Sequence, residues 1–149
     1  ASGANYLFIR GGALTTSFDT SDYASFTITA NTGSFNVTGA SLFARTGGSG
    51  QETNFALRSD VDGFATDLFT GSSAASSSFD SFSTSTITGI SDETSVEFRL
   101  YVWGTTQVSH THRYDDISLT VTPVPEPSML GLAGCVGLCG VLVRRRGTA

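Results

Sequence analysis

Lysine is missing from this chain, and all eight of its basic residues are arginines. Acidic residues number 13, so the formal net charge at pH 7 is −5. An acidic chain without a basic stripe is a poor partner for nucleic acid, which attracts proteins mainly through its phosphates. The same charge balance argues against attraction to the anionic lipids of a membrane surface.

Sulfur is scarce as well, because residues 1–122 contain neither cysteine nor methionine. No disulfide framework can therefore stiffen this part of the chain, although the composition is compatible with export. Cys135 and Cys139 lie together in an apolar run near the carboxyl terminus. We interpret them as small apolar side chains rather than as a disulfide or a metal-binding pair.

A helical period is also absent before the carboxyl-terminal run, whereas alternation of apolar and polar residues recurs throughout residues 1–122. This pattern predicts an all-β fold, most simply a jelly-roll-like antiparallel β-sandwich of two sheets. A break is expected at Gly39 and a mobile loop at Ser72–Ser78. The predicted strands are Tyr6–Arg10, Ser25–Ala30, Phe35–Thr38, Ser41–Arg45, Thr53–Ser59, Ala65–Phe69, Phe79–Ile87, Ser95–Trp103 and Arg113–Thr122.

The clearest strand, Ser95–Trp103, carries the strongest candidate binding surface. Its alternation predicts that Val96, Phe98, Leu100 and Val102 face the core. The opposite face then presents Glu97, Arg99, Tyr101 and Trp103. Sugars have apolar faces and a rim of hydroxyls, which aromatic rings and a bidentate guanidinium suit. Arg99, Tyr101 and Trp103 could thus form a saccharide platform; alternatively, a loop covers the aromatics and Arg99 pairs with a carboxylate.

The sequence Asp60-Val61-Asp62-Gly63, with Asp67 close by, is similar to the start of a calcium loop. It lacks the later ligands of such a loop, and the alternative is an ordinary polar β-turn. His110 and His112 could lie on one side of a strand, but a catalytic zinc needs a third ligand. We expect these histidines to lie in a solvated hairpin tip, and we predict neither a metal nor a cofactor.

No G-x-S-x-G nucleophile elbow occurs, and no pair of carboxylates stands out as a glycosidase dyad. The segments Val96–Tyr101 and Asp115–Leu119 together resemble the closing strands of concanavalin-like or galactose-binding-like sandwiches in exported bacterial proteins. That resemblance concerns shape only. The sequence therefore predicts a non-enzymatic domain.

The carboxyl terminus carries an uncharged apolar run over Met129–Val143, followed directly by Arg144, Arg145 and Arg146. As a helix, 15 residues reach about 22 Å, which is short for a bilayer core of about 30 Å. Thinning of the bilayer or snorkelling of the arginines would cover the difference. Because positive charge stays in the cytoplasm, residues 1–122 are expected outside. A buried core helix is the alternative, but the run lacks an amphipathic stripe.

Pro125-Glu126-Pro127, the apolar run and the terminal arginines together resemble the PEP-CTERM sorting signal of exopolysaccharide-producing Gram-negative bacteria. The resemblance covers about residues 124–146. It implies that an exosortase, a membrane-embedded transpeptidase, recognises Pro125, Glu126 and Pro127 and releases the protein to the cell surface or the surrounding matrix. The prolines hold the backbone extended, as a protease cleft requires. A plain linker before an ordinary anchor is the alternative.

The expected organisation is a β-sandwich over residues 1–122, a linker over 123–128, a membrane helix over 129–143 and a basic cytoplasmic tail over 144–149. Exported proteins also need a leader, which residues 1–15 do not contain, so we expect it to have been removed or the chain to be a fragment. The leading hypothesis is an exported surface or matrix protein with a structural or adhesive role. The alternatives are a carbohydrate-binding module that contacts exopolysaccharide and a hydrolase of matrix glycans.

Processing of the tail can be tested on protein recovered from its native cell surface or culture medium. We expect its intact mass to lack the residues that follow Pro125-Glu126-Pro127, because the sorting signal is read and removed during release. A recovered protein that retains Arg144–Arg146 would contradict processing.

Overall fold

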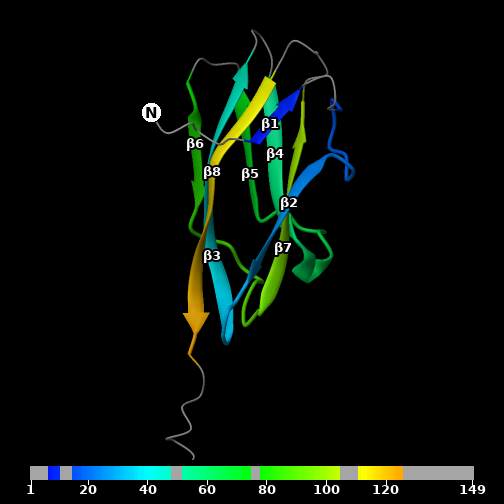
Figure 1. The fold of residues 1–149 in the computed structure, drawn as a ribbon. Coiled ribbons are helices and arrows are strands. Elements are labelled where there is room, and N and C mark those ends of the chain that lie inside the picture. The colour runs from blue at the N-terminus through cyan, green and yellow to red at the C-terminus, as the bar shows by residue number, and fades with distance from the viewer. Residues whose placement is uncertain (1–6, 11–14, 48–51, 75–77, 105–110, 126–149) are drawn as a thin grey trace, which may run out of the picture.

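The computed structural model describes residues 7–10, 15–47, 52–74, 78–104 and 111–125. These residues form eight strands and one short 3₁₀ helix, η2, over Asp60–Asp62 (Figure 1). The strands are β1 (Leu7–Arg10), β2 (Tyr23–Thr29), β3 (Ser34–Gly47), β4 (Glu52–Ser59), β5 (Phe69–Ala74), β6 (Asp80–Thr84), β7 (Ser95–Trp103) and β8 (Thr111–Val124).

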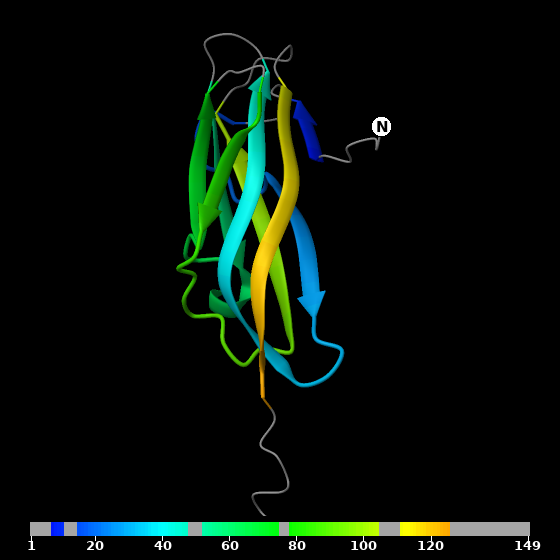
Figure 2. The ribbon, with the colours of Figure 1, turned by 90° about the vertical axis from the view of Figure 1, so that its left-hand side faces the viewer.

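Two antiparallel four-stranded sheets form the molecule, with strand orders β1-β8-β3-β6 and β2-β7-β4-β5. The first half of the chain pairs with the second half in nested order, so that β1 meets β8, β2 meets β7, β3 meets β6 and β4 meets β5. This is the strand order of an eight-stranded jelly roll. Figure 2 shows β3 and β8, the two longest strands, running together along the molecule.

The predicted all-β sandwich is confirmed, and Ser95–Trp103 is a strand over the expected residues. Three expectations for individual segments were wrong. Gly39 lies inside the continuous strand β3 instead of breaking it, and the ladder between β3 and β8 shifts register between Val37 and Gly39. The expected strand at Ala65–Phe69 begins only at Phe69, and β5 then runs through Ala74 into the expected loop.

Gly39 takes this place because there is no room for a side chain. A Cβ atom built on Gly39 would lie 2.7 Å from the carbonyl oxygen of Thr84 on β6. Real Cβ atoms essentially never approach a backbone oxygen so closely. The sequence predicts that Gly39 breaks a strand. In the fold, this glycine instead permits close contact between two strands.

An aromatic cluster around Phe55 holds the two sheets together. Phe55, on β4, is fully buried and packs edge-on against Phe69 at 5.5 Å, Phe82 at 5.1 Å and Tyr114 at 6.1 Å between ring centroids. Phe69 belongs to the same sheet, whereas Phe82 and Tyr114 come from the opposite sheet. Burial raises the pKa of the Tyr114 hydroxyl, so that it stays protonated. Aromatic pairs of this kind contribute beyond the area that they bury.

A second inter-sheet contact is polar. His112 on β8 is buried, and its Nδ1 forms a hydrogen bond with the Thr53 hydroxyl on β4. Thr46 Oγ1, on β3, lies 3.0 Å from Thr53 Oγ1 and 2.9 Å from the carbonyl oxygen of Ser73 on β5. The expectation that His112 lies in a solvated hairpin tip was therefore wrong, because alternation along β8 turns it inward. His110 lies outside the described residues.

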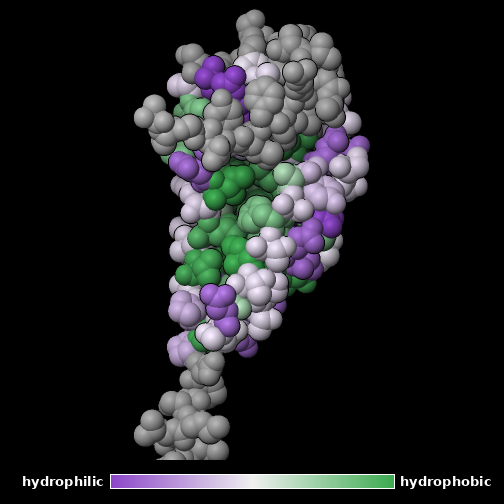
Figure 3. Space-filling view, in the orientation of Figure 1, coloured by the Kyte–Doolittle hydropathy of each residue, from purple (hydrophilic) through white to green (hydrophobic). Residues whose placement is uncertain are grey.

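One side of the sandwich remains partly open. Among the described residues, β1 pairs only with Thr111–Tyr114 of β8, and no other described strand pairs with the rest of that edge of β8. Hydrophobic side chains gather in this opening (Figure 3). Phe26 and Ile28 of β2 and Ile117 and Leu119 of β8 are partly buried there against the core.

The carboxyl-terminal expectations fall largely outside the described residues. Pro125 is exposed directly after β8. Glu126, Pro127, the apolar run 129–143 and Arg144–Arg146 are not described. Within the ranges that are described, no helix is long and apolar enough to cross a membrane. β8 extends to Val124, two residues beyond the predicted strand end at Thr122.

Replacing Thr53 with valine tests the polar contact between the sheets. Valine keeps the shape of threonine but removes the hydroxyl that bonds to His112 and Thr46. We expect the free energy of unfolding to fall by about 1–3 kcal/mol in urea titration, because polar groups remain buried with one partner fewer. Thr27→Val, on the exposed face of β2, is the control and should change stability by less than about 0.5 kcal/mol. Equal stability of the two variants would contradict a structural role for this contact.

Candidate functional site

The outer face of the sheet β2-β7-β4-β5 carries the most developed arrangement of side chains in the described residues. As predicted, Val96, Phe98, Leu100 and Val102 are buried in the core, and the alternate residues of β7 turn outward. The structure adds groups from β2, from β4 and from the loops that flank them. We call this set the arginine–aromatic face; it comprises Phe18, Tyr23, Arg58, Phe64, Glu97, Arg99, Tyr101 and Trp103.

Arg99 occupies the middle of this face between two aromatic rings. Its guanidinium carbon lies 4.4 Å from the ring centroid of Tyr23 and 3.7 Å from that of Phe64. Its Nε donates a hydrogen bond to Glu97 Oε1 at 2.9 Å, which raises the pKa of the guanidinium further above its usual value. Arg99 is therefore a permanently charged group that two aromatic rings and one carboxylate contact.

Arg58 lies directly opposite Arg99 in the ladder between β4 and β7. Its Nε donates to Asp67 Oδ1 at 2.5 Å, and its Nη1 donates to the carbonyl oxygen of Phe64 at 3.0 Å. Its guanidinium carbon also lies 4.3 Å from the ring centroid of Phe18. Each arginine thus has its own carboxylate, which offsets the repulsion expected between like charges on neighbouring strands.

Tyr101 does not belong to an exposed platform, and that part of the prediction was wrong. Its side chain is only 2% exposed, because Phe18 and Tyr23 pack over it at 5.2 Å and 5.5 Å between ring centroids. Trp103 is partly exposed and meets Phe18 edge-on at 5.3 Å. The sequence analysis gave an alternative in which the aromatics are covered and Arg99 pairs with a carboxylate. That alternative is correct for Tyr101 and for Arg99. It is Tyr23, 41% exposed, that offers its ring to solvent beside Arg99.

Phe64 reaches Arg99 through an unusual backbone conformation. Its φ is +62°, a region that bulky residues rarely adopt and that costs on the order of 1–3 kcal/mol. The conformation is held at both backbone polar groups, since Phe64 N donates to the carbonyl of Ser59 and Phe64 O accepts from Arg58. Asp62 accepts hydrogen bonds from the backbone N–H groups of Ala65 and Thr66, just beyond it. Strain kept in place by several contacts is typical of functional loops.

The carboxylates expected to start a calcium loop serve separate structural contacts. Asp60 Oδ1 accepts a hydrogen bond from the backbone N–H of Glu97, and Asp67 pairs with Arg58. Asp62 holds the turn that follows η2. In the part of the chain that the structure describes, no group of three or more histidine, cysteine or acidic residues could hold a metal ion. The segment is therefore a hydrogen-bonded 3₁₀ turn that ends at Gly63.

Sequence reasoning missed Tyr23, Phe64, Arg58 and Phe18. Tyr23 could have been found by extending the alternation of Ser25–Ala30 by two residues, because Tyr23 and Ser25 lie on the same face. Arg58 faces outward by the alternation of β4, but only the pairing of β4 with β7 places it beside Arg99. Phe64 and Phe18 lie in loops, where no sequence period indicates a direction.

Comparisons with known proteins bear on the fold. No family model matches the chain, and no curated protein does. A solved structure described as the C-terminal domain of EclA, a sugar-binding protein, is similar, with a TM-score of 0.58, 9% sequence identity and 80% of each chain covered. A structure described as a CBM4 matches with a TM-score of 0.41 and 14% identity over 78% of this chain and 86% of that one, which is too weak to carry an argument. The chain therefore shares the β-sandwich fold of the EclA domain.

Removing the carboxylate of Asp62 should loosen the turn that presents Phe64. Hydrogen bonds lower the pKa of the Asp62 carboxyl from its ordinary value of 3.8, and the bond to the Thr66 side chain has the largest effect. Its stabilising effect is therefore complete above the ordinary carboxyl pKa and is lost as the pH falls through the lowered value. We expect Asp62→Ala to melt at a lower temperature than the parent protein near neutral pH. This difference should shrink as the pH falls below about 4, because the carboxyl group of the unfolded chain then takes up a proton while that of the folded protein is still ionised. A difference in melting temperature that stays constant down to pH 2 would contradict this role.

Proposed function

We propose that the sandwich binds neutral carbohydrate through the exposed part of the arginine–aromatic face: Tyr23, Phe64, Arg99 and Trp103. The observation that carries the proposal is the position of Arg99, whose guanidinium lies over the rings of Tyr23 and Phe64 and bonds to Glu97. Aromatic rings accept the apolar face of a sugar, while the guanidinium and the carboxylate bond to its hydroxyls. Binding requires no further group, so the proposed role is recognition rather than catalysis.

Exposure of the charged groups favours a neutral ligand over an acidic one. The Glu97 side chain is 35% exposed against 26% for Arg99, and the Asp67 side chain is 42% exposed against 17% for Arg58. An anionic sugar approaching this face would meet carboxylates that are more accessible than the arginines. Residues 1–122 also carry a formal charge of −7, since the last 27 residues hold three arginines and one glutamate. The exposed carboxylates and the negative net charge of residues 1–122 both oppose the binding of polyuronates.

The fold adds independent support. The similar domain of EclA is described as part of a sugar-binding protein. Similarity at 9% identity transfers no residue from that protein to this one. It does show that a sandwich of this fold occurs in a sugar-binding protein. This favours carbohydrate binding over a purely structural role.

The tail suggests where the sandwich would work. We propose that the PEP-CTERM-like signal, with Pro125, Glu126 and Pro127 read by an exosortase and Arg144–Arg146 on the cytoplasmic side, delivers the domain to the surface of a Gram-negative cell. Exopolysaccharide in the surrounding matrix would then be its ligand. The structural or adhesive role and the binding role meet in this picture, because attachment to polysaccharide is itself adhesive.

Paired variants test the face directly. Tyr23 is 41% exposed on one sheet and Phe43 is 40% exposed on the outer face of the other, which makes them matched controls. We expect Tyr23→Ala to weaken retention in affinity gels that contain a neutral glucan, galactan or mannan by about tenfold, which corresponds to about 1.4 kcal/mol. Phe43→Ala should bind the neutral polysaccharide as the parent protein does. Alginate, a polyuronate, should retain neither Phe43→Ala nor the parent protein.

The remaining outcomes separate the alternatives. Equal weakening in Tyr23→Ala and Phe43→Ala would show that loss of an exposed aromatic, not this face, is responsible. If none of the neutral polysaccharides retains the parent protein, the structural role stands without sugar binding. Release of reducing ends from any of these polymers would favour the hydrolase instead.

A further inference from the structure

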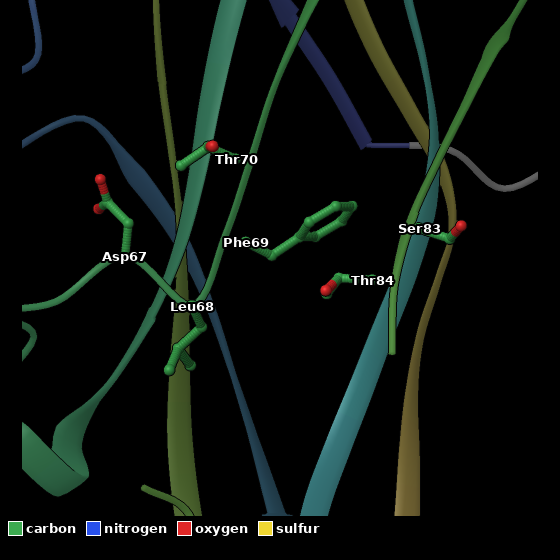
Figure 4. Close-up of a pocket in the computed structure, with 6 residues that line it drawn as sticks. All are labelled: Asp67, Leu68, Phe69, Thr70, Ser83 and Thr84. Carbon is green, nitrogen blue, oxygen red and sulfur yellow. The ribbon is translucent and has the colours of Figure 1, made fainter. Parts of the chain in front are cut away.

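The sandwich also has a cleft on the side where the edge strands of its two sheets face each other. β5 is the last strand of one sheet, and β6 is the last strand of the other. The cleft between them is open to solvent and has a volume of about 480 Å³. Its lining consists of Asp67, Leu68, Phe69, Thr70, Ser83 and Thr84 (Figure 4). This volume lies within the roughly 300–1,000 Å³ of small-molecule sites.

Two contacts give the cleft its shape. At one end β5 and β6 are tied together, because the Ser73 hydroxyl donates to Asp80 Oδ2 at 3.1 Å. Farther along, the Phe69 ring extends from β5 toward β6, and the Thr84 side chain extends back toward Phe69 (Figure 4). Phe69 is 8% exposed and packs edge-on against Phe55, so its ring is a fixed wall of the cleft.

The chemistry of the lining selects a class of ligand. In the part of the chain that the structure describes, β5 and β6 each pair with a single strand, so the outer edge of each has backbone N–H and C=O groups that no described strand bonds. Figure 4 shows the Phe69 ring and the Thr84 side chain turned into the cleft, whereas the side chains of Asp67, Thr70 and Ser83 point away from it. None of the lining residues is basic. A neutral molecule with many hydroxyls and an apolar face fits these groups. An anionic molecule would find no cation in this lining.

We infer that the cleft is a second carbohydrate site, which holds one or two neutral sugar residues between Phe69 and Thr84. It rests on the proposed function only for the class of ligand, since the cleft and the arginine–aromatic face have no residue in common and are linked only by the ion pair between Asp67 and Arg58. The two sites lie on different surfaces, one on the outer face of a sheet and the other between sheet edges. One protein could then hold two polysaccharide chains, which makes it a cross-linker of the matrix.

Separate variants distinguish the two sites. Thr84→Phe places a ring in the cleft, whereas Ser81→Phe, on the same strand but with an exposed, outward side chain, is the matched control. Calorimetric titration with hexasaccharides of glucan, galactan and mannan should give two binding events per parent chain. We expect Thr84→Phe to lose one event and to retain the other. Tyr23→Ala should show the reverse, and Ser81→Phe should keep both.

Nuclear magnetic resonance of the parent protein provides a test that needs no variant. On adding the same hexasaccharide, the amide signals of Phe69, Gly71 and Thr84 should shift at saturation, in addition to those of Ser25 and Arg99. Shifts confined to Ser25 and Arg99 would overturn the cleft site and leave the proposed function intact. Shifts confined to the cleft would support the second site and overturn the first, and no shift with any probe would overturn both.

Cross-linking follows from two sites and can be measured on mixtures with long polymer. The parent protein should raise the viscosity of a solution of the polysaccharide that it binds, whereas Thr84→Phe and Tyr23→Ala should each leave the viscosity near that of polymer alone. Persistence of the effect in Thr84→Phe would contradict a bridging role for the cleft.

Discussion

The packing of aromatic rings around Phe55 is the contact on which the rest of the architecture depends. Phe55 meets Phe69 in its own sheet and Phe82 and Tyr114 in the other, so one buried ring sets the spacing of both layers. Gly71 shows how tight this packing is, because a Cβ at that position would lie 2.5 Å from the Phe55 ring. Interiors packed at this density transmit the position of each strand to its neighbours.

Both candidate sites inherit their geometry from that core. β4 carries Phe55 on its inner face and Arg58 on its outer face, so the ring that fixes the strand also fixes the arginine beside Arg99. Along the cleft, the wall at Phe69 belongs to the same cluster that joins the sheets. A rigid scaffold of this kind keeps aromatic and charged groups oriented before a ligand arrives, which reduces the entropy lost on binding.

The arginine–aromatic face illustrates how charge is managed in an acidic domain without lysine. Two guanidinium groups face each other across neighbouring strands, an arrangement that would be unfavourable alone. Separate carboxylates and stacked rings stabilise each of them, so that the face combines polarity with a local charge close to balance. Arginine suits this role better than lysine because its planar group can stack and bond at the same time.

The sequence by itself determined the all-β class, the limits of β7 and the inward and outward faces of that strand, because the side-chain period of a strand is two wherever it lies. Only the tertiary structure decided that Tyr101 is buried, that Tyr23 and Phe64 flank Arg99, and that His112 lies inside the sandwich. These outcomes depend on loops and on pairings between strands distant in the chain, such as β4 with β7. Alternation indicates which face a residue occupies, but not what will cover that face.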